Sequence, residues 1–251
     1  MRIHRWLGTA SSLVLAAVFA MSGGATLAAS KAGVASAVKN RVDGTVGNRT
    51  RPLVAGSDVF VREVVRTGEA STAQLLLLDE TSLSIGPQSE ITLDRFVFDP
   101  NRKAGSVVLN ASRGAFRFIS GSQQSSSYQI KTPVANIGVR GSIFDLLIVG
   151  IVPNIKAILI LVEGIGFATL PDGQTVELTI PGQAIELNSD GTWRIFTYDS
   201  TIFHASNGDP NFPLFGNTYF HQIEILDGRI DLMDQLLSGG PRPDLGGGNN
   251  N

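Results

Sequence analysis

The sequence predicts an all-β fold, either a sandwich or a solenoid, for the central part of this 251-residue chain. Short runs rich in Val, Ile, Leu, Thr and Phe recur at the spacing of roughly 8–12 residues that is typical of all-β domains. Gly, Asp, Asn and Pro separate these runs, as turn residues do. No segment of this part keeps a helical period, so alternating helices and parallel strands are not expected.

The predicted strands have two kinds of pattern. Some alternate, so that Phe116 and Phe118 share one face while Arg117 lies on the other. Residues 75–78 and 158–162 are apolar at every position, which indicates burial of both strand faces. The first seven predicted strands are residues 58–65, 73–78, 82–85, 90–98, 106–110, 115–119 and 127–131.

The most apolar segment, residues 143–167, could be mistaken for a membrane span. Asp145, Lys156 and Glu163 interrupt it, and no uninterrupted run approaches the ~20 residues that a spanning helix needs. Pro153 and Asn154 form a turn signal between two β-branched runs. The segment therefore predicts two buried strands joined by a turn.

The first 29 residues have the layout of a secretory signal peptide. Arg2 and Arg5 precede a short apolar stretch over residues 7–21, and small residues follow it. We expect cleavage between residues 25 and 32 and a periplasmic or secreted location, with a retained N-terminal anchor as the alternative. Cysteine is absent, so neither a disulfide nor a lipid-modified cysteine is expected.

The remaining chain divides by composition into four further segments. Residues 30–52 are small and polar, which predicts a flexible lead-in with at most one short strand, followed by the β domain over 53–198. Residues 199–237 predict a strap and an amphipathic helix, and 238–251 a disordered tail. Aromatics at 203, 212 and 215 are expected to lie against the β domain. The apolar helical positions are Ile223, Leu226, Ile230, Met233 and Leu237.

Two stretches of the β domain, residues 81–93 and 176–187, share a weak internal pattern. Each reads as a short strand, a turn of Gly and Pro, a Gln and a second alternating strand. Two unrelated hairpins with the same turn chemistry, or a duplicated solenoid unit, both explain the pattern.

The chain carries little that predicts catalysis. The formal net charge is −2 and no basic run is present, which disfavours nucleic-acid binding. Apart from His4 in the predicted signal peptide, the chain contains two histidines, His204 and His221, which are too few for a histidine-based metal cluster. No nucleotide-binding, calcium-loop or serine-hydrolase motif is present. We expect no enzymatic activity, no metal and no cofactor; an envelope enzyme is the weakest alternative.

An ordered set of motifs over residues 53–187 resembles the FecR-type domain, a bacterial cell-envelope module. The set includes residues 56–59, 65–68, 73–78, 79–89, 106–109 and 114–118, and the best match runs from Ile130 through the Thr-Pro and Gly-Val-Arg-Gly elements to Glu163-Gly164. Ser142 departs from the family, which usually has threonine at that position. The motif residues, which we expect to be structural, are Arg66, Thr67, Gly68, Thr132, Pro133, Gly138, Arg140, Gly141, Glu163 and Gly164.

These motif residues also have a physical interpretation of their own. Gly68, Gly141 and Gly164 suit tight turns or close backbone approach, and Pro133 forces the residue before it into an extended conformation. Arg66 and Arg140 each follow an apolar run, where a guanidinium needs a partner. We expect Arg140 to pair with Asp145 or Glu163 or to cap carbonyls, with an anionic ligand as the alternative.

The resemblance implies a role in binding. The sensors that gave the family its name are anti-sigma regulators with a cytoplasmic domain, whereas an export segment directly precedes the β domain here. We therefore expect an exported, non-enzymatic binding or scaffold module whose partner is an envelope protein, a polysaccharide or peptidoglycan. One alternative is a periplasmic signalling component that contacts a TonB-dependent receptor or an anti-sigma regulator. Another is a structural surface protein that assembles through its β edges.

Overall fold

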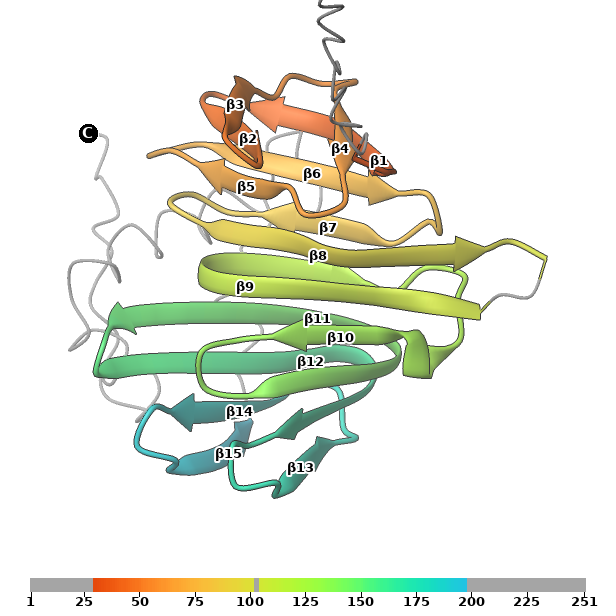
Figure 1. Cartoon of the computed structure of the whole chain (residues 1–251). Helices are drawn as coiled ribbons and strands as arrows, with labels where there is room; N and C mark the ends of the chain where they lie inside the picture. Colours follow the sequence, from red (N-terminus) through yellow and green to blue (C-terminus); the bar gives the residue numbers. More distant parts are fainter. Residues whose placement is uncertain (1–28, 102–103, 198–251) are drawn as a thin grey trace, which may run out of the picture.

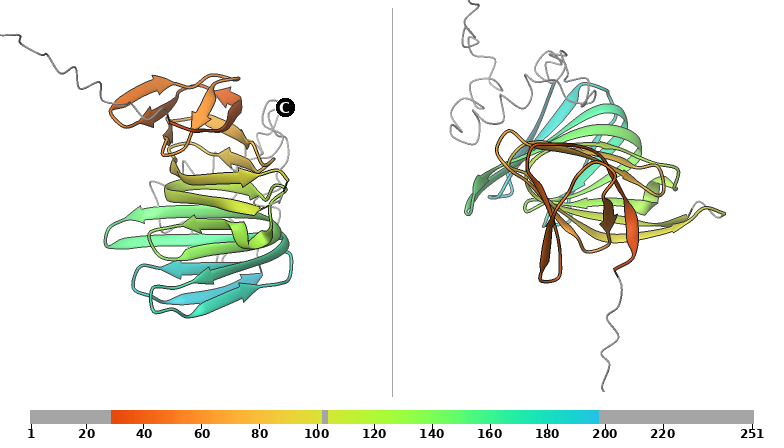
Figure 2. Two further views of the ribbon diagram at one scale, coloured as in Figure 1. Left: turned by 45° about the vertical axis from the view of Figure 1, so that its right-hand side comes forward. Right: turned by 90° about the horizontal axis from the view of Figure 1, so that it is seen from above.

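The computed structural model describes residues 29–101 and 104–197, and these residues are almost entirely β-strand. Fifteen strands form one continuous hydrogen-bonded network, which folds over into two facing walls (Figures 1 and 2). The predicted all-β class is confirmed. The arrangement has features of both expected types, since the walls face each other as in a sandwich while successive strands stack along one axis as in a solenoid.

We call the two walls A and B. Wall A contains in spatial order β4 (Asp58–Phe60), β1 (Lys31–Lys39), β6 (Thr72–Leu77), β7 (Ser82–Ile85), parts of β9, β11 and β12, then β14 (Gln183–Asn188) and β15 (Trp193–Thr197). Wall B contains β3 (Arg49–Pro52), β2 (Val42–Val46), β5 (Val64–Thr67), β8 (Glu90–Asp99), part of β9, β10 (Tyr128–Lys131), the other parts of β11 and β12, and β13 (Thr175–Leu178).

Three long strands belong to both walls. They are β9 (Ala104–Ile119), β11 (Asn136–Ile151) and β12 (Asn154–Thr169), and each bends from one wall to the other at a glycine. Gly114, Gly141 and Gly164 have φ angles of 101°, 56° and 83°, which glycine adopts without the steric cost that other residues meet. The predicted strands 106–110 and 115–119 are consequently one bent strand, and the predicted turn at Pro153 and Asn154 is confirmed.

The chain crosses between the walls at two edges. The left edge in Figure 1 contains the turns 39–41, 67–71 and 86–89 and the bend 113–115; the right edge contains 60–63, 77–81, 119–127, 140–142, 163–165 and 178–183. The 3-10 turn η1 (Ser125–Ser127) lies in the right edge. Both patterned stretches, 81–93 and 176–187, are wall crossings rather than hairpins, one at each edge.

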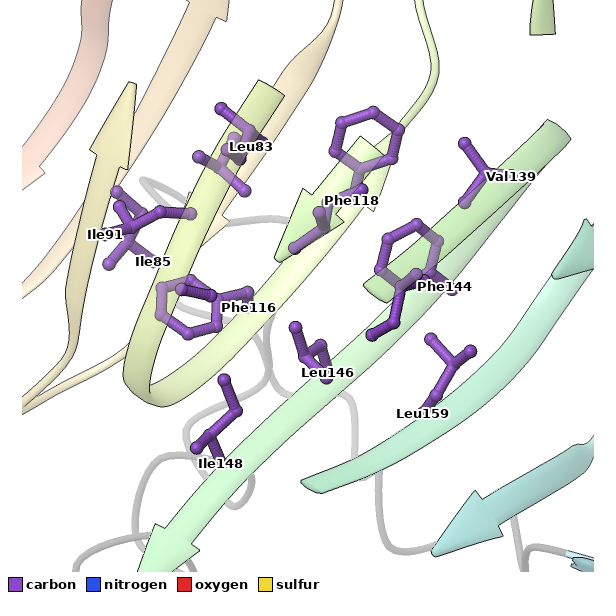
Figure 3. Close-up of a cluster of buried hydrophobic side chains, with 14 of the residues drawn as sticks. Leu83, Ile85, Ile91, Phe116, Phe118, Val139, Phe144, Leu146, Ile148 and Leu159 are labelled. Carbon is purple, nitrogen blue, oxygen red and sulfur yellow. The ribbon is translucent and has the colours of Figure 1, made fainter. Parts of the chain in front are cut away.

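The hydrophobic core fills the space between the walls (Figure 3). Phe116, Phe118 and Phe144 are the largest of its fully buried side chains, and each is 1% exposed. The rings of Phe118 and Phe144 stack with centroids 5.2 Å apart, and Tyr128 of wall B meets Phe118 edge-on at 5.6 Å. Because these rings come from both walls, aromatic packing ties the walls together.

The N-terminal region corrects one prediction. Residues 30–52 are not a flexible lead-in, because they form β1, β2 and β3. The small residues that suggested flexibility are required by close packing: a Cβ on Gly33 would clash with the Leu76 carbonyl of β6, and Ala32 and Ala35 are fully buried. Alanine and glycine have weak strand propensity, so the pattern concealed the strands.

Several predictions fall on residues that the structure does not describe. The signal peptide, apart from residue 29, the strap and helix over 199–237 and the tail over 238–251 all lie outside the described ranges. Within 29–101 and 104–197, no helix has the length and hydrophobicity needed to cross a bilayer.

The bend glycines give a test of the two-wall architecture. A Cβ on Gly164 would clash with the Gly141 carbonyl, whereas a Cβ on Gly141 would have no atom within 4 Å. Gly164→Ala should lower the free energy of unfolding by about 2–5 kcal/mol, because left-handed strain and overpacking add. Gly141→Ala should cost about 1 kcal/mol from strain alone. Urea unfolding measures both; equal losses would contradict the close approach of the two bends.

Candidate functional site

Most of the motif residues expected from the sequence lie at or beside the two edges where the chain crosses between walls, while Thr132 and Pro133 lie in the turn between β10 and β11. Ser142 is the centre of the right edge and is buried. Its Oγ donates to the Ile165 carbonyl at 2.6 Å and accepts from the N–H groups of Arg140 and Ile165 at 3.1 and 3.2 Å. Its own backbone N–H donates to Ser120 Oγ at 3.1 Å. One hydroxyl thus satisfies backbone groups of two strands where their regular pairing is interrupted.

Three motif glycines lie around this edge, at bends or at a close approach of two strands. Gly141 and Gly164 are the bends of β11 and β12. Gly138 lies beside Phe167 of β12, and a Cβ there would overlap the aromatic ring. Close packing gives a physical reason for glycine at positions 138 and 164, whereas the positive φ angle gives one at position 141.

The left edge uses hydroxyls in the same way. Thr67 Oγ1 donates to the Gly86 carbonyl at 2.6 Å and accepts from the Ser89 N–H at 2.9 Å. Ser89 Oγ in turn accepts from the Ala115 N–H at 3.1 Å, next to the bend of β9. The Gly68 N–H donates to the Arg41 carbonyl at 2.9 Å. Thr67 and Gly68 therefore link successive turns of the chain.

Two further motif elements close strand ends. Arg66 forms a two-pronged ion pair with Glu90 of β8, with N–O distances of 2.9 and 3.2 Å. Thr132 Oγ1 donates to the Ala135 carbonyl at 2.8 Å and accepts from the Ala135 N–H at 3.0 Å. This closes the turn around the exposed Pro133, between β10 and β11.

Arg140 does not make the expected ion pair. Asp145 binds Arg117 instead, with both N–O distances at 2.6 Å, and Glu163 is exposed on the neighbouring strand. Arg140 is exposed as well, because it directly precedes the bend at Gly141, where the chain turns from wall B to wall A. Sequence proximity suggested the Asp145 partner, but the bend places Asp145 in the other wall.

A buried carboxylate that the sequence did not single out fixes the right edge. Asp79 is fully buried and accepts hydrogen bonds from the Thr81 hydroxyl at 2.9 Å, the Gln123 amide at 2.8 Å and the Tyr128 hydroxyl at 3.2 Å. Burial is the main reason that the pKa of Tyr128 is raised. The cluster joins the β6–β7 turn to the segment before β10. Only spatial proximity could reveal it, since its members lie far apart in sequence.

Glu63 is a second buried carboxylate near the N-terminal end of the stack. Arg51 Nη2 lies 2.9 Å from its Oε1, and the Phe60 N–H donates to its Oε2 at 2.8 Å. Burial raises the pKa of Glu63, although the Phe60 N–H and the Arg51 charge both lower it. Gly44 leaves the space for this carboxylate, because a Cβ there would clash with it.

The outer face of wall A carries a three-residue ionic cluster. Glu186 of β14 lies 3.1 Å from Lys156 Nζ of β12 and 2.8 Å from Arg194 Nη2 of β15. Burial alone would raise the pKa of Glu186, but the hydrogen bonds from Arg194 and Lys156 outweigh it and leave that pKa below its ordinary value.

The most exposed large apolar side chains of the described residues lie on a projecting hairpin. Ile151 and Val152 are each 80% exposed at the tip where β11 turns into β12. The paired ends of the two strands extend outward beyond the stack (Figure 1). Adjacent exposed apolar residues are typical of a protein contact site when they stand on a rigid scaffold. The described residues contain no cluster of three or more potential metal ligands.

Comparisons with known proteins agree with the motif pattern. Residues 63–152, from the buried Glu63 to the exposed tip, match the family described as FecR protein. Two solved structures of a "putative anti-sigma factor from Parabacteroides distasonis ATCC 8503" are similar at 14% identity, with a TM-score of 0.45. Each similarity covers 55% of this chain and 61% of the other. A search of curated proteins gave no significant match.

The hydroxyl at position 142 should be needed for stability. Ser142→Ala leaves buried N–H and C=O groups of Arg140 and Ile165 without their partner, so the free energy of unfolding should fall by about 1–3 kcal/mol. Ser142→Thr keeps the hydroxyl and should lose less than half as much. Urea unfolding compares the three proteins; an alanine variant as stable as the parent would contradict this role.

The ionic cluster of Glu186 should stabilise the fold at pH values above the pKa that Glu186 has in the unfolded chain. Its folded pKa lies below the ordinary value of 4.5, so the contribution is complete above pH 4.5 and disappears as the pH falls through the lowered pKa. The parent should therefore lose its stability advantage over Glu186→Gln on acidification below pH 4.5. Urea unfolding between pH 7 and pH 3 measures the difference. A difference that stays constant with pH would contradict the lowered pKa.

Proposed function

Because residues 63–152 of this chain are a FecR domain, we propose that the protein is an exported, non-enzymatic binding module of the bacterial cell envelope. The observation that carries the proposal is the pair of exposed side chains Ile151 and Val152, which stand at the end of the matched region. The export segment over residues 1–29 supports a periplasmic or secreted location. The proposed partner is a protein of the envelope.

The scaffold behind the tip is suited to present a contact surface. The tip continues directly into the strands that hold Phe144, Leu146 and Leu159 in the core. A hairpin that is fixed at its base loses little conformational freedom when it binds. Two apolar side chains on such a hairpin can fill a pocket on a partner and form the centre of a contact.

The chemistry of the tip favours a protein partner over a polysaccharide. Ile151, Val152 and Pro153 offer apolar surface with no charged group, and protein contacts are centred on buried apolar anchors. An envelope regulator, such as a receptor or an anti-sigma protein, would be a partner of this chemical class. We therefore place the protein in an envelope regulatory or scaffold system.

A comparison of tip variants tests the proposal. The tagged full chain should be recovered from the periplasmic fraction, and an envelope protein should be captured with it at constant stoichiometry. Ile151→Asp combined with Val152→Asp should reduce that capture at least about tenfold, the effect of losing roughly 1.4 kcal/mol of binding free energy. Capture is measured by quantitative mass spectrometry after crosslinking in intact cells.

A matched control separates the tip from a general effect of charge. Ile180 is 59% exposed at the right edge, away from the tip, so Ile180→Asp should leave capture unchanged. Unfolding in urea shows whether each variant keeps the fold. Retention of the same partner by the double tip variant would overturn the proposed contact, and recovery of the chain only from the cytoplasm would overturn the envelope location.

A further inference from the structure

The outer face of wall A, away from the core, carries a second apolar surface. Strand pairing places Leu147 opposite Ile158, and Ile160 opposite Ala184. Their sequence neighbours Leu146, Leu159 and Ile185 point into the core, so alternation directs the first set outward. We call this set the outer patch; it consists of Leu147, Val149, Ile158, Ile160 and Ala184.

The outer patch is buried although it is separate from the core. Ile158 is 1% exposed and Leu147 4%, yet neither belongs to the cluster between the walls. None of the strands in the described ranges lies over this face, because the two walls pack against each other on the opposite side. The apolar run 158–162, which predicted burial on both strand faces, is explained only if something covers the patch. The same prediction is wrong for residues 75–78, because Leu76 and Leu78 are exposed.

We propose that residues 220–237 of the same chain cover the outer patch as an amphipathic helix. The chain leaves the described structure at Thr197, at the end of β15, two strands from the patch residues of β12. Phe196, the residue before, is paired with Ala184 and so lies on the same outer face, half-buried. The following segment therefore starts beside the surface that it would cover.

Length and pattern fit this occupant. A helix over residues 220–237 is about 27 Å long at 1.5 Å per residue, enough to cross four strands that lie about 4.8 Å apart. Its apolar positions form one stripe: Ile223, Leu226, Ile230, Met233 and Leu237. Such a stripe is stable in water only when it packs against another apolar surface, and the outer patch is one.

The charges are complementary as well. Lys156, Arg194 and Glu186 form an ionic cluster beside the patch, and these three described side chains together carry one net positive charge. The segment carries Glu224, Asp227, Asp231 and Asp234 against one cation, Arg229. An acidic helix on this face lies next to cations, whereas a second copy of wall A would bring the same net positive charges together.

Crosslinking tests the position of the segment. The chain has no cysteine of its own, so the full chain with Ile160→Cys and Ile230→Cys has one possible disulfide. Mild oxidation should convert most of the protein to an internally crosslinked monomer. The control pairs Ile230→Cys with Glu177→Cys, which is exposed on wall B, and should give little internal crosslink. Dominant crosslinked dimers would show that a second copy covers the patch and would overturn the proposal.

Two double variants test whether residues 220–237 cover the outer patch, and neither changes a residue of the two walls. Leu226→Asp with Ile230→Asp disrupts the apolar stripe, and His221→Asp with Gln235→Asp adds the same charge to the opposite face of the helix. The first pair should raise the fluorescence of a hydrophobic dye several-fold, because it uncovers the patch; the second should not. Equal dye binding by both pairs would overturn the proposal. Binding through the Ile151–Val152 tip is measured separately and does not depend on the result.

Discussion

The structure depends on how the backbone is satisfied where the chain crosses between the two walls. A strand that bends out of its sheet interrupts the regular ladder of hydrogen bonds, and buried N–H and C=O groups left unpaired there would destabilise the fold. Ser142, Thr67 and Ser89 supply the missing partners with their hydroxyls. Gly114 and Gly164 at two of the bends let neighbouring segments approach more closely than a Cβ would allow.

The motif residues near the edges make contacts that hold the backbone in place. Thr67 and Gly68 tie neighbouring turns together, Gly141 and Gly164 make the bends, and Thr132 closes a turn. Their roles are geometric, and each contact is to backbone of the same domain. Arg140 and Glu163 differ, since both are exposed beside a bend. The contact that we propose with another molecule lies instead at the hairpin tip of β11 and β12.

The two faces of wall A have different chemistry and therefore different partners. The inner face meets wall B through aromatic rings and aliphatic side chains. The outer face combines an apolar patch with the buried pair of Arg117 and Asp145 and the cluster around Glu186. A buried ion pair adds little to the stability of a fold, but an arrangement that leaves one of its charges buried without a partner is strongly destabilised. The outer face is thus suited to hold one particular covering segment in one register.

The sequence by itself determined the all-β class, the turn at Pro153 and Asn154, the FecR-type motifs and the burial of both faces of residues 158–162. These features follow from local signals: alternation, turn residues and uninterrupted apolar runs. Only the tertiary structure decided that residues 106–110 and 115–119 form one bent strand, that residues 30–52 belong to the walls, and that Asp145 binds Arg117 instead of Arg140. Those outcomes depend on which distant strands become neighbours. A residue's partner across a sheet is set by strand register and bending, and neither can be recognised from the local sequence pattern.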